Sequence, residues 1–269
     1  MIEPHSPPRL ARTGEADSLL GIGSETENKF QNFKLTADDI DGISEHLKFD
    51  HTVGGDFASF HDNFEQHAAE RAQQIREGKL RVIIARQRGR LIGTSVVSLE
   101  NGVMGKELSS NEAWAAGTLI RQEMRSTGVA FSLAAEQEKI AQESGKDTMR
   151  TQVHPDNYGS SRFRMKIGYE MCGITWRRER GDVVYNYRKD LTREPKEKVE
   201  WGKKYQDGEL QEIQDISDDS PNQILANPLN PALIEKILAS GYRGVHLLTP
   251  PDYGQTIGSG KNLVVFIKE

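Results

Sequence analysis

The 269-residue sequence lacks several features that define common protein classes. It has one cysteine, Cys172, which excludes an internal disulfide. It has no apolar run near the ~18 residues of a spanning helix and no apolar signal core, so we expect no membrane segment. A reducing cytoplasm is the simplest location, although a protein exported by a specialised machine would look the same. The net charge of -5 and the absence of a basic stripe with interleaved aromatic residues disfavour nucleic-acid binding.

Composition and breaker residues divide the chain into four parts. Hydrophobic residues make up only 36% of the chain and charged residues 28%, so part of it should be exposed. Residues 1–29 contain prolines and glycines without apolar periodicity and are predicted to be a disordered tail. Residues 30–190 are the predicted main domain, 191–222 a charged linker or strap, and 223–269 a small C-terminal module.

The most regular pattern runs from residue 112 to residue 169. An apolar run at 113–120 predicts a strand, and apolar residues at helical spacing after Gly128 predict a helix. Residues 148–153 predict a second strand, which Pro155 ends. A short helix is predicted from Asn157 to just before Gly168. The segment therefore reads as strand, helix, strand and helix in succession.

The turn at residues 125–130 is suited to binding an anion. Gly128 lets a ligand approach the backbone without a Cβ between them, and the amides that begin the helix have no intrahelical acceptors. A helix N-terminus favours a negative group by about 0.3–1 kcal/mol, and a diphosphate can use several amides together. Arg125 and Arg121 would add positive charge. A helix start without a ligand is the alternative, just as Asn157 could be only an N-cap.

This turn fits the R/Q-x-x-G-x-G/A signature of the GNAT family, the acetyl-CoA dependent N-acetyltransferases, in Arg125, Gly128 and Ala130. The later segment VHPDNYGSSRFRMKIGYE resembles the family's asparagine helix and closing Gly-aromatic pair. The resemblance covers about residues 30–190. It implies an α/β (α+β) fold with a mixed, largely antiparallel sheet flanked by helices. It also implies that the following residues bind acetyl-CoA: Leu119, Ile120, Arg125, Ser126, Thr127, Gly128, Val129, Ala130 and Asn157.

The resemblance further implies direct attack of a neutral amine on the thioester. A base must then take a proton, and a backbone amide near residues 118–120 would stabilise the oxyanion. Glu112, which precedes the central strand, and His154, with an ordinary pKa of about 6.5, are the candidate bases. Glu123 lies in the turn and is expected to face solvent.

One position departs from the family pattern. Many members carry a tyrosine, the general acid, one residue after the large apolar residue of the asparagine helix. Here Phe163 takes the apolar place and Arg164 the tyrosine place. An arginine, with a pKa above about 12, cannot usefully donate a proton, but it could stabilise the departing thiolate as a fixed charge. Tyr158 or a water could replace the acid.

The rest of the chain supplies further elements and no predicted metal site. A strand near Phe33, a helix capped by Thr36, and helical segments to about Gly78 are predicted before a hairpin at 80–85 and 91–99. Residues 170–176 and 182–187 predict a final strand pair. The spacings of four histidines match no compact metal site: His46, His51, His61 and His67.

The sequence of the C-terminal module predicts a helix at 232–239 and strands at 245–248 and 263–267. It vaguely resembles the end of ADP-ribosyltransferase-like domains of some phage and toxin proteins. Too little chain remains for such a domain, so a packing or partner-binding module is predicted. The glycine-rich stretch 254–261 lacks the residues of a phosphate-binding P-loop and predicts a hairpin loop.

Two functions are consistent with the sequence. The first is an N-acetyltransferase that moves acetyl from acetyl-CoA to an amine on a small molecule, a protein lysine or a protein N-terminus. The alternative is a binding or assembly protein, for example a phage or effector component, that keeps the fold with weak or no catalysis. It would dock a protein partner through residues 1–29 or 223–269. Intact Arg125, Gly128 and Asn157 favour the enzyme, whereas Arg164 and the extensions favour the alternative.

Overall fold

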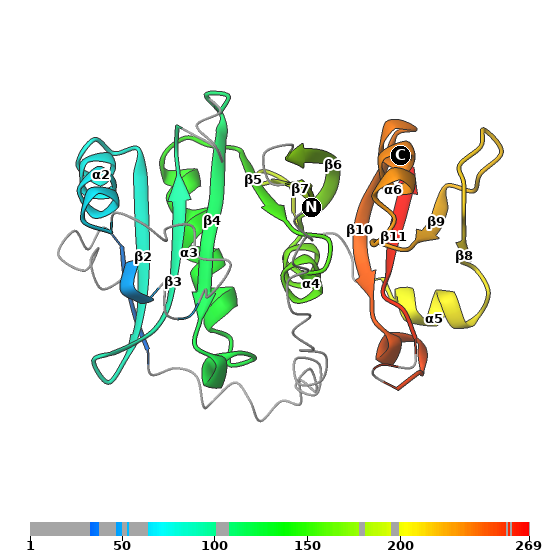
Figure 1. Ribbon diagram of the computed structural model, residues 1–269, viewed down its shortest axis with the longest axis horizontal. Coiled ribbons are helices and arrows are strands. Elements are labelled where there is room, and N and C mark those ends of the chain that lie inside the picture. Colours follow the sequence, from blue (N-terminus) through cyan, green and yellow to red (C-terminus); the bar gives the residue numbers. More distant parts are fainter. Residues whose placement is uncertain are drawn as a thin grey trace, which may run out of the picture.

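The computed structural model describes residues 33–37, 47–49, 53, 64–100, 108–177, 181–194, 199–256, 258 and 260–268 (Figure 1). The predicted tail at 1–29 lies outside these residues. So do His46, His51 and His61, while His67 lies in a described helix whose side chain at that position is not described.

The described part of the chain contains both strands and helices. The strands are β1 (Lys34–Ala37), β2 (Leu80–Gln87), β3 (Arg90–Ser98), β4 (Glu112–Ile120), β5 (Thr148–Val153), β6 (Glu170–Arg177), β7 (Asp182–Asp190), β8 (Gln211–Glu212), β9 (Gln223–Ala226), β10 (Tyr242–Leu248) and β11 (Leu263–Lys268). The helices are α2 (Phe64–Arg76), α3 (Val129–Glu143), α4 (Tyr158–Lys166), α5 (Trp201–Gln206) and α6 (Pro231–Ala239), with 3-10 turns η4 (Gln122–Met124) and η5 (Pro250–Tyr253).

All described strands lie in one sheet, in the order β1-β2-β3-β4-β5-β7-β6-β10-β11-β9-β8. The pairs β4–β5 and β8–β9 are parallel, and the other neighbouring pairs are antiparallel. The prediction of a mixed, largely antiparallel sheet flanked by helices is confirmed.

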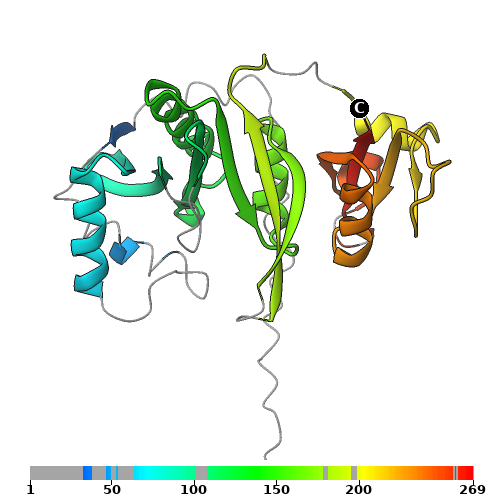
Figure 2. The same ribbon diagram turned by 90° about the horizontal axis from the view of Figure 1, so that it is seen from above.

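Strand β2 shows how the sheet is buried on both faces. Successive side chains of a strand point to opposite faces. Ile83 and Ala85 join the core that contains α3, whereas Val82 and Ile84 join the core that contains α2. Figure 2 shows these two helices on opposite sides of the sheet. An almost continuous apolar run is therefore needed in β2.

Two local predictions near the N-terminal edge need correction. Thr36, predicted to cap a helix, lies within β1 and pairs with Ile84 of β2. The hairpin turn between β2 and β3 is only two residues long. Arg88 and Gly89 both have positive φ, 52° and 79°, which is the conformation of a tight hairpin turn that matches strand twist.

The C-terminal module extends the same sheet. Strand β10 pairs with β6 through Gly244 and Met171, and residues of the module share one core with Tyr169 and Tyr185 (Figure 1). Residues 199–222, part of the predicted linker, contain α5 and β8, and Leu210 between them is 4% exposed. This part of the strap is therefore folded onto the module.

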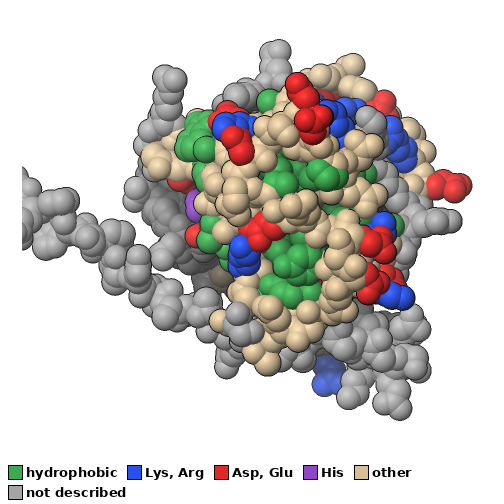
Figure 3. Space-filling view, turned by 90° about the vertical axis from the view of Figure 1, so that its right-hand side faces the viewer, with side chains coloured by type: hydrophobic (Ala, Val, Ile, Leu, Met, Phe, Trp, Pro, Cys, Tyr) green, Lys and Arg blue, Asp and Glu red, His purple; other side chains and the backbone are tan. Residues whose placement is uncertain are grey.

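Figure 3 looks onto the outer side of the C-terminal module, where hydrophobic side chains lie in the middle of a face with charged groups around them. Leu229, which follows β9, is 56% exposed. Strand β8, at this edge of the sheet, is only two residues long. Such a short edge strand offers little backbone for pairing with another chain.

No helix within the described ranges is long and apolar enough to cross a membrane. The same ranges contain no group of three or more metal-ligating side chains placed to hold a metal ion.

Candidate active site

Strands β4 and β5 separate partway along their length. They pair in parallel only at Glu112–Thr148, Ala113–Met149 and Trp114–Arg150. Strand β4 then continues to Ile120 and β5 to Val153 without pairing to each other. The two strands leave an opening between their C-terminal ends, which we call the splay. Helix α3 begins just beyond β4, and α4 just beyond β5, so both helix N-termini lie at this end of the sheet.

A β-bulge lies in β4 beside the splay. Thr94 pairs with Leu119 and Val96 with Ala116, so Gly117 and Thr118 together oppose Ser95. Gly117 adopts a positive φ of 56°. A bulge changes the direction of side chains and bends the strand. Here it brings the hydroxyl oxygens of Thr118 and Ser95 to 2.7 Å from each other.

Gln137 of α3 holds the bulge from the helix side. Its Nε2 donates to the carbonyl oxygen of Val96 at 2.6 Å and, at 3.5 Å, to that of Ala116. The residue is completely buried. Sequence reasoning missed this role, although a polar residue on the apolar stripe of a helix, between Leu133 and Ile140, was a visible signal.

The N-terminus of α3 presents free backbone amides. Gly128 is its N-cap with φ of 83°, and Ser126 also has a positive φ, 67°. The amides of Arg125 and Thr127 bond back to carbonyls of η4. Among the described residues, the amides of Ser126, Gly128, Val129 and Ala130 have no hydrogen-bond acceptor. Nothing lies within 4 Å of where a Cβ on Gly128 would be, so the space for an anion is open.

Two arginines near this turn differ in how free they are. Arg125 is exposed and makes no ion pair within the described part of the chain. Arg121 donates from Nε to the carbonyl oxygen of Leu91 at 2.6 Å, and its guanidinium lies 5.1 Å from the centre of the Phe49 ring. Arg125 is therefore the side chain available to a bound phosphate, while Arg121 is held against the core.

Asn157 caps α4 as the sequence alternative predicted. Its Oδ1 accepts a hydrogen bond from the Ser160 amide at 3.1 Å. The side-chain Nδ2 has no partner among the residues that the structure describes. The cap leaves this group free to meet a ligand in the splay, so both roles of Asn157 are compatible.

Arg164 reaches from α4 to β4. Its side chain is 4% exposed, and Nη2 lies 3.4 Å from Thr118 Oγ1 in the bulge. Its guanidinium also faces the rings of Phe163 and Tyr169, at 5.7 and 5.3 Å from their centres. The predicted fixed charge therefore lies at the splay, next to the strand segment predicted to hold the reacting carbonyl.

Glu112 lies at the other end of β4. Its Oε1 accepts from Nε of Arg150 at 2.6 Å, and its side chain is largely buried. Seven residues of strand, about 23 Å, separate it from Leu119. A carboxylate in a partly buried ion pair at the closed end of the two strands is poorly placed to take a proton from a substrate. Glu112 is therefore not given the role of base in the reaction proposed below.

His154 lies at the open end, directly after β5. Its Nδ1 is in hydrogen-bond contact with the carboxylate of Asp156, and Nε2 lies 3.9 Å from Asp182 Oδ2. An Nδ1–H that donates to Asp156 leaves Nε2 as the proton acceptor. Asp156 is a second residue that sequence reasoning missed, because it lies in the turn that Pro155 begins.

Tyr158, the predicted alternative acid, opens α4. Burial raises the pKa of its hydroxyl, and a hydrogen bond with Asn262 of the C-terminal module acts in the opposite direction. The phenol therefore stays protonated at neutral pH, which is the state that a hydrogen-bond or proton donor needs.

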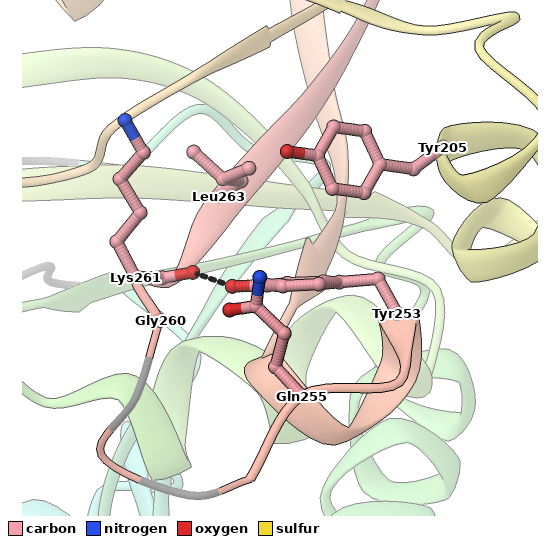
Figure 4. A pocket seen from close by; sticks show the side chains of 6 residues that line it. All are labelled: Tyr205, Tyr253, Gln255, Gly260, Lys261 and Leu263. Carbon is pink, nitrogen blue, oxygen red and sulfur yellow. Dashed lines mark hydrogen bonds between the residues drawn. The ribbon is translucent and has the colours of Figure 1, made fainter.

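A separate hollow of about 410 Å³ lies in the C-terminal module (Figure 4). It is lined by Tyr205, Tyr253, Gln255, Gly260, Lys261 and Leu263. Tyr253 Oη donates to the carbonyl oxygen of Lys261 at 2.6 Å, and the Lys261 ammonium pairs with Glu212 at 2.6 Å. Two of its polar groups, the Tyr253 hydroxyl and the Lys261 ammonium, are thus already paired, and we assign it no ligand.

Comparisons with known proteins agree with this geometry. A model of the Acetyltransferase (GNAT) family matches residues 41–169. An N-acetyltransferase from Staphylococcus aureus Mu50 is 12% identical with a TM-score of 0.50, covering 60% of this chain and 99% of that one. A spermidine N-acetyltransferase chimera from Vibrio cholerae and hSSAT is also 12% identical with a TM-score of 0.50, covering 60% and 96%. At such identities these structures show the fold alone. A search of curated proteins found no match.

Proposed function

We propose that this protein transfers acetyl from acetyl-CoA to an amine of a small molecule or a protein, because a model of the Acetyltransferase (GNAT) family matches residues 41–169. The observation that carries the proposal is the row of free amides at Ser126, Gly128, Val129 and Ala130, beside the splay. These amides are suited to the diphosphate of the coenzyme, and Arg125 adds a charge. Asn157 Nδ2 and the backbone of Leu119 and Ile120 are left for the pantetheine arm and the thioester.

The reaction needs few groups from the protein. The amine nitrogen bonds to the thioester carbonyl carbon, the carbon–sulfur bond breaks, and the electron pair leaves on sulfur. The amine gives up one proton. In the proposal His154 accepts that proton through Nε2, held in the correct tautomer by Asp156. Each positioned acid or base contributes on the order of a hundred- to ten-thousand-fold in rate.

Arg164 and Tyr158 are proposed to act on the departing sulfur. Arg164 supplies a fixed positive charge from a buried side chain, and electrostatic interactions of buried groups are stronger than those in solvent. Tyr158, which burial keeps protonated, is the candidate proton donor. Together they would fill the place of the family's tyrosine acid.

The proposal is tested by calorimetric titration of acetyl-CoA into the wild-type protein and a Gly128→Glu variant. We expect micromolar binding by the wild type and at least about tenfold weaker binding by the variant, because its carboxylate would occupy and repel the diphosphate site. The matched control is Gly145→Glu, at the other end of α3. Both glycines have positive φ, 83° and 74°, and open space around the added Cβ.

The control separates loss of the site from loss of the fold. Both variants should lose a similar amount of stability from the left-handed backbone, roughly 1–2 kcal/mol. Only Gly128→Glu should lose coenzyme binding. No binding by the wild type would reject the enzyme and favour the non-catalytic assembly protein. Equal loss in both variants would reject the site at the N-terminus of α3.

A further inference from the structure

Arg164 carries a buried positive charge that no carboxylate in the described part of the chain balances. The side chain is 4% exposed and forms no ion pair with the acidic residues that the structure describes. Its Nη1 is fully buried without a hydrogen-bond partner, and its Nη2 contact with Thr118 is long, at 3.4 Å. A neighbouring arginine shows the contrast. Arg162 on the same helix pairs with Asp252 at 2.8 Å.

The surroundings of Arg164 compensate for only part of this charge. A side-chain hydrogen bond with Tyr169 and the faces of the Phe163 and Tyr169 rings stabilise the cation, but such contacts with neutral groups are weaker than a carboxylate partner in a buried site. A buried cation without a counter-ion is costly, and the cost recurs in every unliganded molecule. With the described residues alone, the site is therefore incomplete without an anion.

The position of the guanidinium shows where that anion would bind. Arg164 spans from α4 to the bulge in β4, across the splay in which the reacting groups meet in the proposed reaction. The long contact with Thr118 is weak, so an anion that enters the splay could replace it at small cost. The planar fork of an arginine matches both oxygens of a carboxylate.

A carboxylate on the substrate and the departing thiolate differ in when their negative charge is present. The thiolate exists only after the carbon–sulfur bond breaks, whereas the charge of Arg164 is present throughout. A permanent negative charge on the bound acceptor would balance it before, during and after transfer. We infer that the acceptor amine also carries a carboxylate, as in an amino acid, and that Arg164 binds this carboxylate. The inference rests on the proposed function and deepens it by naming the acceptor class.

The same charge selects against other amines. A polyamine or another polycation would place like charges in a poorly solvated space, which is unfavourable. A lysine side chain within a protein, with neutral amides on either side, offers no carboxylate near its amine. Arg164 would thus act on specificity as well as on affinity.

The test measures release of the coenzyme A thiol from acetyl-CoA by the full-length protein. The acceptors are the standard amino acids, their carboxamides, spermidine and a lysine peptide with blocked ends. We expect at least one amino acid to be acetylated with kcat/KM about 10–100-fold above that of its carboxamide, the range for a hydrogen-bonded charge. Spermidine and the peptide should be poor acceptors.

Variants then assign the preference to Arg164. Arg164→Met keeps the length of the side chain but removes the charge, and should bring the acid-to-amide ratio close to one while Kd for acetyl-CoA changes less than about threefold. Arg162→Gln removes a charge from the same helix and should keep the ratio. A role on the thiolate alone would slow acids and amides equally, so the ratio would not move.

Several results would overturn the inference: equal turnover of acids and amides, a ratio unchanged in Arg164→Met, better turnover of spermidine or the peptide, or no amino acid accepted by a protein that binds acetyl-CoA. If Arg164→Met does not fold, the wild-type ratio and Arg164→Lys, which should keep the preference, decide the question. Failure to bind acetyl-CoA would instead remove the proposed function itself, so the two failures are distinguishable.

Discussion

At the scale of single residues, the buried tyrosines make the stability of the fold depend on pH in the alkaline range. Burial raises the pKa of Tyr169 to about 12, partly offset by the nearby charge of Arg164. Burial likewise raises the pKa of Tyr185 and Tyr187. In the unfolded chain a tyrosine titrates near pH 10. Because the folded pKa is the higher one, the stabilisation is complete below pH 10 and is lost as pH rises toward 12.

We therefore predict that Tyr169→Phe flattens the pH dependence of stability in that window. The free energy of unfolding of the wild type should fall between pH 10 and 12, and the variant should fall less steeply, by up to ~1.4 kcal/mol per pH unit. Urea unfolding at pH 7, 10, 11 and 12 measures both slopes. Identical slopes above pH 10 would show that the Tyr169 hydroxyl does not titrate as its burial requires.

The residues that sequence reasoning identified are those whose chemistry is local. The helix start at Gly128 was predicted correctly because the start of a helix is set by neighbours in the chain. The partner of Glu112 is Arg150, and that of Arg164 is Thr118, 46 positions away. No local sequence pattern predicts such contacts. The sequence therefore could not reveal that Glu112 forms an ion pair with Arg150, or that Arg164 is buried at the splay.

At the scale of elements, the bulge in β4 depends on a single buried amide. Gln137 donates to Val96, whose carbonyl oxygen would lose this buried partner without the glutamine. The Oε1 atom of Gln137 is buried and has no partner among the described residues, so burial of this side chain itself costs some stability. The bulge, and with it the position of Thr118, relies on this contact between α3 and the sheet.

Gln137→Leu should therefore lower the free energy of unfolding by about 1–3 kcal/mol, because it leaves a buried carbonyl unsatisfied. Gln142→Leu is the control on the same helix. Gln142 also donates to a backbone carbonyl, that of Leu191 at 3.0 Å, but at the surface, so its loss should be within about 0.5 kcal/mol. Urea unfolding of both variants checks this, and equal losses would argue against the structural role of Gln137.

Elements themselves were largely predictable because their periodicity is strong. The strand at 148–153 and the helix after Asn157 agree with β5 and α4. The prediction of a helix cap at Thr36, where the apolar periodicity is weak, was wrong. The prediction of a linker also missed α5 and β8, because this segment is charged although it is folded. The splay and the bulge were not derivable from periodicity, since they are properties of two strands rather than one.

At the scale of the molecule, the C-terminal module and the main domain form one packed unit. Gly244 permits the close approach of β10 to β6, because a Cβ there would lie 2.9 Å from Met171 Cβ and 3.1 Å from Val264 Cγ1. Arg162 of α4 pairs with Asp252, which is part of the capping box that begins η5. The module therefore braces the helix that carries Asn157 and Arg164.

Gly244→Val should consequently destabilise the whole protein, by about 1–3 kcal/mol for overpacking. We expect one cooperative urea transition, because the module and the domain share a core. Gly159→Ala is the control, since nothing lies within 4 Å of its added Cβ, and it should be neutral or stabilising by up to about 1 kcal/mol. Two separate transitions in the wild type would contradict the shared core.

The overall arrangement was the least predictable level. The sequence predicted a module joined by a linker, and the helix at 232–239 and both strands were found close to their expected places. Gly244 and Met171, which pair between β10 and β6, lie more than seventy positions apart, and no sequence motif predicts this pairing. How the module packs on the main domain depends on whether the surfaces of the two folded parts are complementary.

The order of the sheet also has a consequence for synthesis on the ribosome. Strand β7 ends at Asp190, and β11, deep in the shared core, ends at Lys268, 78 residues later. At roughly 5–20 residues per second, the edge of β6 and its apolar neighbours wait on the order of 4–16 s for their cover. During that interval the nascent chain exposes an open, hydrophobic strand edge, which is the kind of surface that chaperones bind.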